Sequence, residues 1–430
     1  MSILKTALLL SLLFLSGAAY SRSYSFSSYE FIGLDRSQES WLLEYLELKF
    51  PCSLSDLEIK KLEEKLLNSQ VFQSAKVYPK VNPSKKFNLA IKVKEKWTTI
   101  PVIRGAIGGG TPLLVAGIYD THSFGRLWTL GGEFRKYGEA PAGGVIWARA
   151  PRWMGGDYYL NFELWKDNRL RNIYDNKFNR IASIDSRATM VNIELRMPVG
   201  INNFNLGLLW SSRAQEPTTI AQETGFYLVE KNQYSLTTGS NTLNKGLVRL
   251  VYDNISVNNI HYHGHRASFS AGPIFYGGVV KSIYELEYFY YHYFERDWNF
   301  AFHSLFGSAS DSSLQNQRFL GGFESIRGIP DGALFGRHAA YSNAELRHFS
   351  FKFPKLWIQS VIFADSGFAT NEEEWRKEPW TSTAGIGLRF SVPQVHRLMF
   401  RIDYAWSIDG SQAQGITAGM NQFFQPYKPL

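Results

Sequence analysis

The sequence predicts a small α+β domain, with elements in the order β-α-α-β-β, followed by an antiparallel transmembrane β-barrel of about 16 strands. Three observations lead to this prediction. Apolar side chains recur at helical spacing before residue 97 but alternate with polar ones after it. The alternating segments are even in number, and the connections between them are long and short in turn. The expected boundaries are 1–21 for an export signal, 24–96 for the α+β domain and 97–430 for the barrel.

The first 21 residues have the pattern of a secretory signal peptide. Lys5 precedes a short apolar run, and small residues follow at 16–19. The apolar run is too short for a transmembrane helix, and no cationic stop follows it. We therefore expect an exported protein that is cleaved near Ser21.

Charge and cysteine content narrow the possible partners. The chain carries a formal net charge of +8 and a single cysteine, Cys52. One cysteine cannot form an internal disulfide, so stability must come from packing or from a closed sheet. The positive charge suits contact with anionic lipid headgroups, whereas nucleic acid is not an expected partner of an exported protein.

The segment 24–96 is predicted to fold as a domain of its own. It contains, in order, a strand at 29–34, an amphipathic helix from 37 to 48, a second helix that Ser53 or Ser55 can cap and that runs to 67, and two strands at 75–81 and 87–95. A three-stranded sheet with helices on one face leaves a strand edge free, and an extended peptide can pair with such an edge. The alternative is a domain that serves only as a spacer.

From residue 97 onward, strands alternate between an apolar and aromatic face and a face that carries charge. In 398–406, for example, Phe400, Ile402 and Tyr404 share one face, while Arg401 and Asp403 lie on the other. Such strands are typical of a barrel with lipid outside and water inside. The soluble alternative is a large β-sandwich, which would turn its apolar face to a core.

About 16 such segments are predicted, and an even number returns the chain to the side from which it entered. They begin near residues 97, 112, 127, 143, 158, 187, 203, 244, 261, 281, 298, 337, 357, 381, 397 and 414. If the first strand starts in the periplasm, the outward connections include the long ones, 168–186, 213–245, 308–336 and 366–380. The inward connections are short, for example 197–202 and 295–297. This asymmetry is typical of outer-membrane barrels.

The connection between strands eleven and twelve is the clearest candidate for a functional loop. Residues 318–336 are rich in glycine and hold Arg327 in their middle, and loops of this length are usually functional. The sequence Ile326-Arg327-Gly328-Ile329 resembles the Val-Arg-Gly-aromatic signature of the BamA, TamA, FhaC and Sam-type superfamily. In that family the sixth external loop folds back into the barrel. Ile329 departs from the signature because it is aliphatic.

Further motifs of this family follow in the same order. Residues 343–347, which include Glu345, resemble the motif of the next strand. A Phe-x-Asp-x-Gly motif and a glycine-rich fourteenth strand are matched by Phe363, Asp365, Gly367, Gly385 and Gly387. Residues 417–424, with Gly419 and Phe424, resemble the closing strand of such barrels. The four motifs before the closing strand, taken in order, carry more weight than any one of them.

The α+β segment resembles the POTRA domain of the same family. The resemblance lies in its element order, in Gly33, and in Glu95-Lys96-Trp97, where the family usually has glutamate, any residue and proline. The resemblance implies a protein of the bacterial outer membrane with its POTRA domain in the periplasm.

The implied activity is the insertion of client barrel proteins by strand templating, at a seam between the first and last strands. The implied partners are unfolded outer-membrane proteins, outer-membrane lipid including lipopolysaccharide, and accessory lipoproteins. Two alternatives stay open. One is an FhaC-like transporter that secretes a polypeptide, although no second POTRA domain or plug helix is visible; the other is a passive porin-like barrel.

Arg327 is predicted to bind Asp365, with Glu345 sharing the contact. By alternation, both carboxylates fall on lumenal faces, and an arginine turned inward must be paired because a buried lone charge is costly. The planar guanidinium suits a two-point contact with a carboxylate. The alternative is that both carboxylates only line a wet lumen.

The sequence indicates no enzyme, cofactor or metal. No Gly-x-Ser-x-Gly elbow is visible, and no catalytic residues are assigned. His261, His263 and His265 alternate on one strand, but no carboxylate or thiolate completes a metal-ligand set beside them.

Overall fold

The structure is a computed structural model of the chain. It describes residues 22–69, 71–83, 85–106, 112–138, 140–153, 158–175, 177–216, 219–220, 241–258, 261–313, 316–322, 324–377, 379–393, 399–411, 413–420 and 422–424. The predicted signal peptide lies outside the described residues. The chain divides into two compact units, one that runs to Lys96 and includes Phe124–Arg126, and one that holds the remainder.

The N-terminal unit contains a four-stranded sheet with the strand order β2-β1-β4-β3. Its elements are β1 (Ser23–Ile32), α2 (Glu39–Tyr45), β2 (Cys52–Ser55), α3 (Asp56–Asn68), β3 (Phe72–Val81) and β4 (Phe87–Glu95). The short strand β2 was not predicted, because four residues are too few to show alternation. Ser55 caps α3 in a capping box with Glu58, which fixes where the helix begins.

One edge of this sheet is protected against pairing. The N–H of Val77 in β3 donates to the Glu63 carboxylate of α3 at 2.7 Å, so it does not donate to β4. Strand geometry places the N–H of Ala75 on the same side as that of Val77, and Pro79, two residues further along, has no N–H. The predicted free edge therefore offers fewer donors than its length suggests.

Glu95, at the end of β4, holds the turn at residues 35–37. Its carboxylate accepts hydrogen bonds from the N–H groups of Asp35, Arg36 and Ser37 at 3.1, 3.0 and 3.0 Å. Partial burial raises the pKa of Glu95, but the hydrogen bonds from Ser37, Asp35 and Arg36 outweigh it and hold the pKa below its ordinary value.

We expect the turn at residues 35–37 to loosen in acid. Since the folded pKa of Glu95 is lowered, its contribution to stability is complete above the ordinary pKa of about 4.3 and is lost as pH falls through the folded value. Hydrogen exchange of the Asp35, Arg36 and Ser37 amides, corrected for intrinsic rates, should show this loss in the full chain. Glu95→Gln should abolish the pH dependence, whereas Glu44→Gln, at an exposed site, should not. Protection that stays constant into acid would contradict the prediction.

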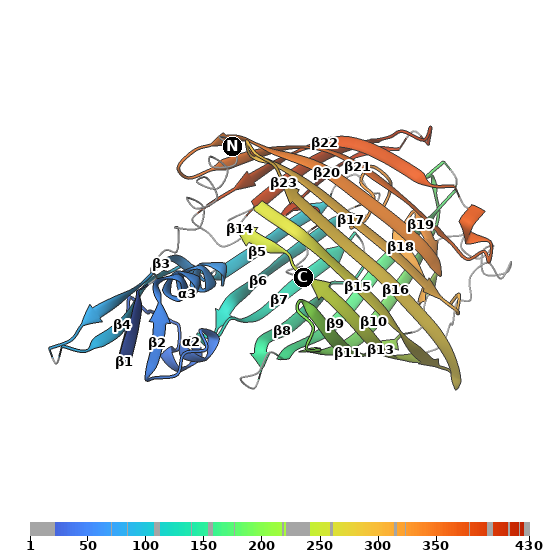
Figure 1. Ribbon diagram of the computed structural model, residues 1–430. Coiled ribbons are helices and arrows are strands. Elements are labelled where there is room, and N and C mark those ends of the chain that lie inside the picture. The colour runs from blue at the N-terminus through green and yellow to red at the C-terminus, as the bar shows by residue number, and fades with distance from the viewer. Residues whose placement is uncertain are drawn as a thin grey trace, which may run out of the picture. The chain divides into compact units, whose positions relative to one another are not determined.

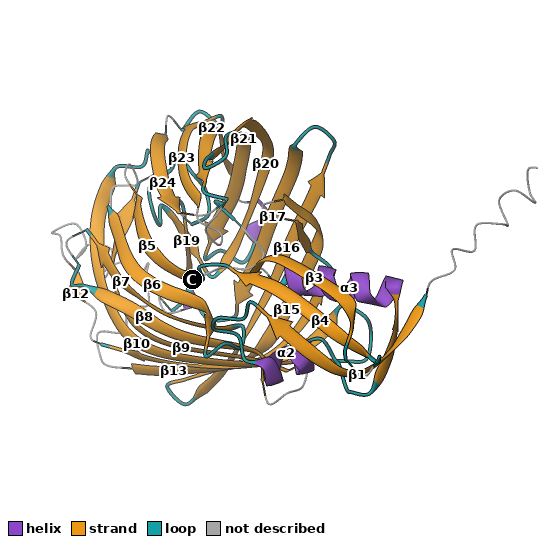
Figure 2. Ribbon diagram, turned by 90° about the vertical axis from the view of Figure 1, so that its left-hand side faces the viewer, coloured by secondary structure: helices purple, strands orange, loops and turns teal. Residues whose placement is uncertain are grey.

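The second unit is a closed barrel of sixteen long antiparallel strands within the described residues (Figures 1 and 2). In chain order they are β5 (Thr99–Ala106), β6 (Leu113–Ser123), β7 (Trp128–Tyr137), β8 (Gly143–Trp153), β9 (Tyr158–Tyr174), β10 (Arg180–Pro198), β11 (Phe204–Gln215), β13 (Asn241–Asp253), β15 (His261–Tyr276), β16 (Val279–Tyr293), β17 (Trp298–Ala309), β20 (His338–Lys352), β21 (Trp357–Thr370), β22 (Thr381–Ser391), β23 (Met399–Ser407) and β24 (Gln414–Met420). The short strands β12 (Thr219–Ile220) and β14 (Ser256–Asn258) join the same sheet, and β18 (Arg318–Leu320) and β19 (Leu334–Gly336) form a separate pair.

The predicted barrel of about 16 strands is confirmed, and most strands begin within three residues of the predicted position. The exception is β10. The predicted connection 168–186 is wrong, because β9 runs to Tyr174 and β10 starts at Arg180. These strand ends carry charge rather than apolar alternation: Arg169 pairs with Asp167 at 2.7 Å and Arg187 with Asp185 at 2.6 Å. Apolar alternation identifies only the part of a strand that must face lipid.

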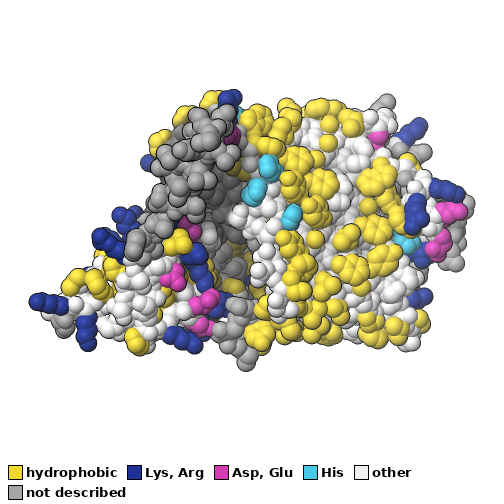
Figure 3. Space-filling view, viewed as in Figure 1, with side chains coloured by type: hydrophobic (Ala, Val, Ile, Leu, Met, Phe, Trp, Pro, Cys, Tyr) yellow, Lys and Arg dark blue, Asp and Glu magenta, His cyan; other side chains and the backbone are white. Residues whose placement is uncertain are grey.

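The outward face of the barrel is apolar, as Figure 3 shows for one side. On β22 and β23 the outward residues Ile386, Leu388, Phe400, Ile402 and Tyr404 are 40–56% exposed. Their neighbours Arg389, Arg401 and Asp403 point inward and are at most 2% exposed. A closed barrel with this exterior indicates contact with lipid. Among the described residues, no helix is long and apolar enough to cross a bilayer.

Candidate functional site

The connection between β17 and β20 folds into the barrel instead of staying outside. β18 and β19 pair at its base, from Arg318 opposite Gly336, and Ile326, Arg327 and Ile329 are at most 1% exposed. Gly328 has a φ of +89°, and a Cβ there would lie 3.0 Å from the Cβ of Ala405 in β23. Glycine therefore allows both the backbone conformation and the close approach to the barrel wall.

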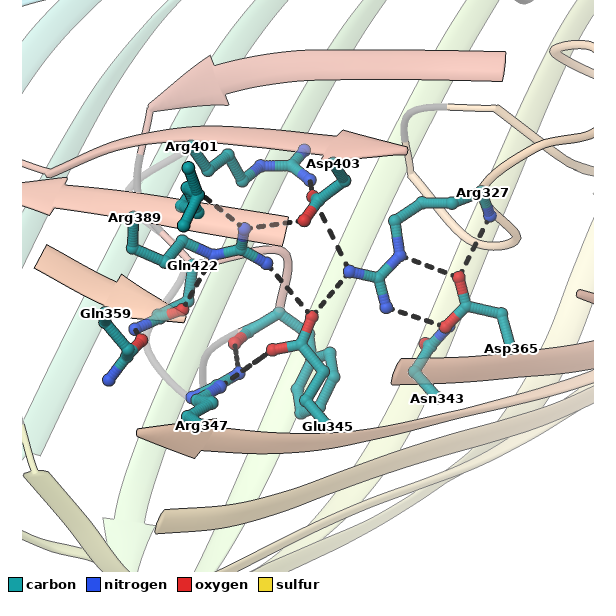
Figure 4. A network of polar contacts seen from close by, with 12 residues as sticks. Arg327, Asn343, Glu345, Arg347, Gln359, Asp365, Arg389, Arg401, Asp403 and Gln422 are labelled. Carbon is teal, nitrogen blue, oxygen red and sulfur yellow. Dashed lines mark hydrogen bonds and ion pairs between the residues drawn. The ribbon is translucent and has the colours of Figure 1, made fainter. Parts of the chain in front are cut away.

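Arg327 donates hydrogen bonds to two carboxylates of the barrel wall, and its Nη1 lies 3.5 Å from a third, Asp403 Oδ2 (Figure 4). Its Nε and Nη2 donate to the two Asp365 oxygens at 2.7 and 2.8 Å, and its backbone N–H donates to Asp365 Oδ2 at 3.0 Å. Its Nη1 donates to Glu345 Oε1 at 2.6 Å. The Asp365 contact is the two-point geometry that a guanidinium forms with a carboxylate.

The guanidinium of Arg327 also lies between two aromatic rings. Its Cζ is 3.4 Å from the ring centre of Phe363 on β21 and 4.0 Å from that of Phe423. Cation–π contacts of this kind are strongest where water is excluded. Arg327 has no exposed surface, so all of its interactions are made inside the protein.

Arg327 is part of a larger cluster of buried charges. Glu345 Oε2 accepts from Arg347 at 2.7 Å, and Asp403 accepts from Arg389 at 2.6 Å and from Arg401 at 2.9 Å. The whole charge cluster holds four arginines and three carboxylates, all at most 2% exposed: Arg327, Arg347, Arg389, Arg401, Glu345, Asp365 and Asp403. Taken alone, the cluster carries one excess positive charge.

The motif glycines make room for this cluster. A Cβ on Gly385 would lie 2.2 Å from Phe363, and one on Gly367 would lie 2.8 Å from Ile326. A Cβ on Gly387 would lie 2.0 Å from the Asp403 carboxylate. The glycine-rich pattern of β21 and β22 thus has a packing reason at the wall that receives the loop.

The structure brings together the predicted residues Arg327, Glu345 and Asp365, but the sequence did not assign four other members of the cluster. Arg347, Arg389, Arg401 and Asp403 lie on lumenal faces that alternation identifies correctly. What alternation lacks is the height of each residue along the barrel and its register with neighbouring strands. An excess of arginine on adjacent predicted strands was the available signal.

The prediction of a closing strand that reaches Phe424 is wrong. β24 ends at Met420, and Gly419 lies in it opposite Arg401. Phe424 is outside any strand and 5% exposed, and its ring centre is 5.4 Å from that of His303 and 6.3 Å from that of Tyr291. The resemblance to a closing strand rests on residue types, and here the lumenal wall supplies the partners of Phe424.

The loop also contacts the wall opposite the charge cluster. Arg171 Cζ on β9 lies 4.1 Å from the ring centre of Phe319, and Arg169 Nη1 lies 4.0 Å from Glu324 Oε2. Between β9 and β21, where Asp365 lies, there are seven long strands in either direction around the ring. The inner loop therefore spans the lumen from one wall to the other.

The two ends of the barrel sheet meet at a weak seam. Within the described residues, β24 pairs with β5 at one position, Thr417 with Ala106. By contrast, β24 pairs with β23 at seven positions and β5 with β6 at eight. Between long strands, the part of the chain that the structure describes has its fewest register pairs at this seam.

Comparison with known proteins identifies a family for most of the chain. Residues 147–424 match the Omp85 superfamily domain. No curated protein matches the chain.

Three solved structures share the fold. BamA from Haemophilus ducreyi lacking POTRA domains 1-3 is 14% identical, with 92% of this chain and 84% of that chain covered and a TM-score of 0.57. CdiB from Acinetobacter baumannii is 12% identical, with 92% and 74% covered and a TM-score of 0.61. CdiB from Escherichia coli is 10% identical, with 94% and 90% covered and a TM-score of 0.52.

Proposed function

Because the chain belongs to the Omp85 superfamily, we propose that it is an outer-membrane assembly factor that inserts client β-barrel proteins. The observation that carries the proposal is the seam between β5 and β24, where the described residues form a single register pair. A client strand needs free backbone donors and acceptors at the depth of the membrane, and a sheet edge provides them. The seam can supply two such edges when it opens.

The loop that spans the lumen supports insertion over passive conduction. Contacts at Asp365 on one wall and at Arg171 on the other keep protein across the channel. A passive pore instead leaves a continuous aqueous path. Strand templating at the seam takes place in the barrel wall and does not require the loop to leave.

The second candidate is the secretion of a polypeptide through the lumen. The likeness to CdiB in fold supports it. This activity requires the loop to move out of the lumen, and that movement breaks the buried ion pairs of Arg327. The two candidates therefore differ in which element has to move, the seam or the loop.

In this proposal residues 1–21 form an export signal, residues 24–96 form a periplasmic POTRA domain, and residues 97–430 form the barrel. Two helices on a mixed sheet support the POTRA assignment. The proposed partners are unfolded outer-membrane proteins, outer-membrane lipid including lipopolysaccharide, and accessory lipoproteins. Depletion of the protein, followed by analysis of the outer-membrane proteome, tests the proposal: loss of several barrel proteins supports it, and an unchanged proteome contradicts it.

The POTRA domain is expected to recruit clients through the part of β3 that keeps its donors. Deletion of residues 24–96 should leave a barrel that still shows heat-modifiable migration but no longer assembles clients. Ala75→Pro removes one outward N–H and should weaken cross-linking of an unfolded client peptide, whereas Ala75→Val keeps the N–H and serves as the control. Glu63→Ala frees the N–H of Val77 and should strengthen cross-linking. If Ala75→Pro and Glu63→Ala both cross-link as the unaltered protein does, the domain is a spacer.

A further inference from the structure

The short segment that follows β24 enters the charge cluster and contacts each of its four arginines. Gln422 is 6% exposed; its Oε1 accepts from Arg389 Nε at 3.2 Å, and its Nε2 donates to Gln359 Oε1 at 2.9 Å. Figure 4 shows this pair at the edge of the cluster. The Gln422 side chain thus joins the segment after β24 to β21 and β22.

The two phenylalanines contact the remaining three arginines. The ring centre of Phe423 lies 4.0 Å from Arg327 Cζ and 4.8 Å from Arg401 Cζ. The ring centre of Phe424 lies 5.1 Å from Arg347 Cζ, and its carbonyl accepts from Arg347 Nη2 at 3.5 Å. Side chains of the cluster and of residues 422–424 therefore pack as one unit, in which Gln422 and Phe424 are buried and Phe423 is half-buried.

The charge balance of the cluster explains why aromatic rings suit this position. Four arginines face three carboxylates, and each buried arginine needs electrostatic partners. The face of an aromatic ring carries the negative part of its quadrupole and stabilises a cation without adding a charge. Phe363 and Phe423 provide such faces on the two sides of Arg327.

We propose that Gln422–Phe424 is an internal latch that couples the inner loop to the closing strand β24. Arg327 belongs to the loop and Phe423 follows β24, so their contact links two elements that share no ladder. By reciprocity, the free energy by which the bound loop stabilises residues 422–424 equals the free energy by which bound residues 422–424 stabilise the loop. The role of the latch rests on the proposed function. Within the described residues β24 is held to β5 at one register position, so the contacts of the latch must also break before β24 can move away from β5.

The coupling can be measured in the purified barrel without any client. Cys52 is the only cysteine of the chain, so a Cys52→Ser background allows a single reporter, Ser325→Cys, at a loop position that is 4% exposed. Phe423→Ala removes the ring that contacts Arg327 and Arg401. Loss of the Arg327 contact alone should raise the rate of maleimide modification roughly 2- to 30-fold, if the modification reports loop release. Phe351→Ala removes the same ring from a site that is 58% exposed and should leave the rate unchanged.

A second variant guards against a failure to fold. If Phe423→Ala does not give a heat-modifiable barrel, Phe423→Leu keeps an apolar side chain and removes the π face. Faster modification in either folded variant supports the latch. Modification at the unaltered rate in the folded variants overturns it.

A functional measurement separates the latch from the proposed activity. A reducible thiol-reactive cross-linker with a spacer, placed between Gln359→Cys and Gln422→Cys, holds the segment 422–424 in place, and client insertion should then stop on cross-linking and return on reduction. If the reporter shows coupling but cross-linking leaves insertion unchanged, the latch stands and the proposed insertion mechanism fails. If the reporter shows no coupling, the latch fails whatever the clients do.

Discussion

Replacing Asp365 with alanine should release the inner loop, residues 318–336, from the barrel wall. It should lower the free energy of unfolding of the barrel by about 3–5 kcal/mol, the range for breaking a buried ion pair. The change removes three hydrogen bonds from Arg327, which has no exposed surface. It also leaves four arginines against two carboxylates. Denaturant unfolding, followed by heat-modifiable migration, measures the stability, and the Ser325→Cys reporter measures loop release.

Lysine at position 327 should not replace arginine. A lysine ammonium is a point charge, so it cannot donate to both Asp365 oxygens and to Glu345 in the same fixed geometry.

Asp297→Ala is the matched control for Asp365→Ala, because it removes a carboxylate from an ion pair with Lys352 that is about one-third exposed. That pair should contribute at most about 1 kcal/mol.

A double-mutant cycle decides whether Arg327 and Asp365 act on each other. If they do, Arg327→Ala together with Asp365→Ala should cost less than the sum of the two single changes. If the two losses of stability simply add, the two residues do not interact, and the predicted contact between the loop and the barrel wall is wrong. Arg327 also contacts Glu345 and two rings, so Asp365 accounts for only part of its interactions.

The barrel could be predicted from sequence because a bilayer imposes strict alternation on the strands that cross it. On β22 and β23 this alternation assigned each residue to the correct face. The same criterion failed for β9 and β10, where the outer strand ends lie outside that constraint and carry charge. In the N-terminal unit it found β3 but not the Glu63 contact that protects its edge, because that contact joins residues fourteen positions apart in the chain.

The charge cluster shows a second limit of sequence reasoning. Arg327 was found because a motif marked it, and Asp365 and Glu345 because their strands face the lumen. Arg389 and Asp403 lie on equally predictable faces, but their contact depends on the register between β22 and β23. The motif resemblance places Phe424 in the closing strand, because an apolar ring suits a lipid-facing strand and a buried wall equally well. Only the three-dimensional path of the chain after Met420 distinguishes these environments.

Closing the seam covalently should abolish client insertion while the barrel stays folded. Ala106 and Thr417 are directly opposed across β5 and β24, and residues opposed in an antiparallel pair lie close enough for a disulfide. In the Cys52→Ser background, the pair Ala106→Cys and Thr417→Cys should form the bond on oxidation. Insertion into liposomes should then fall to the level seen without the protein, and a reductant should restore it.

The matched control places the same bond in a complete ladder. Ile103 and Ala116 are opposed across β5 and β6, so Ile103→Cys with Ala116→Cys should form a bond that leaves insertion unchanged. Normal insertion by the oxidised seam variant would rule out templating at this seam. Secretion through the lumen should survive the closed seam, because it depends on movement of the loop and not of β24. The closed seam therefore distinguishes the two candidate activities by the element that has to move.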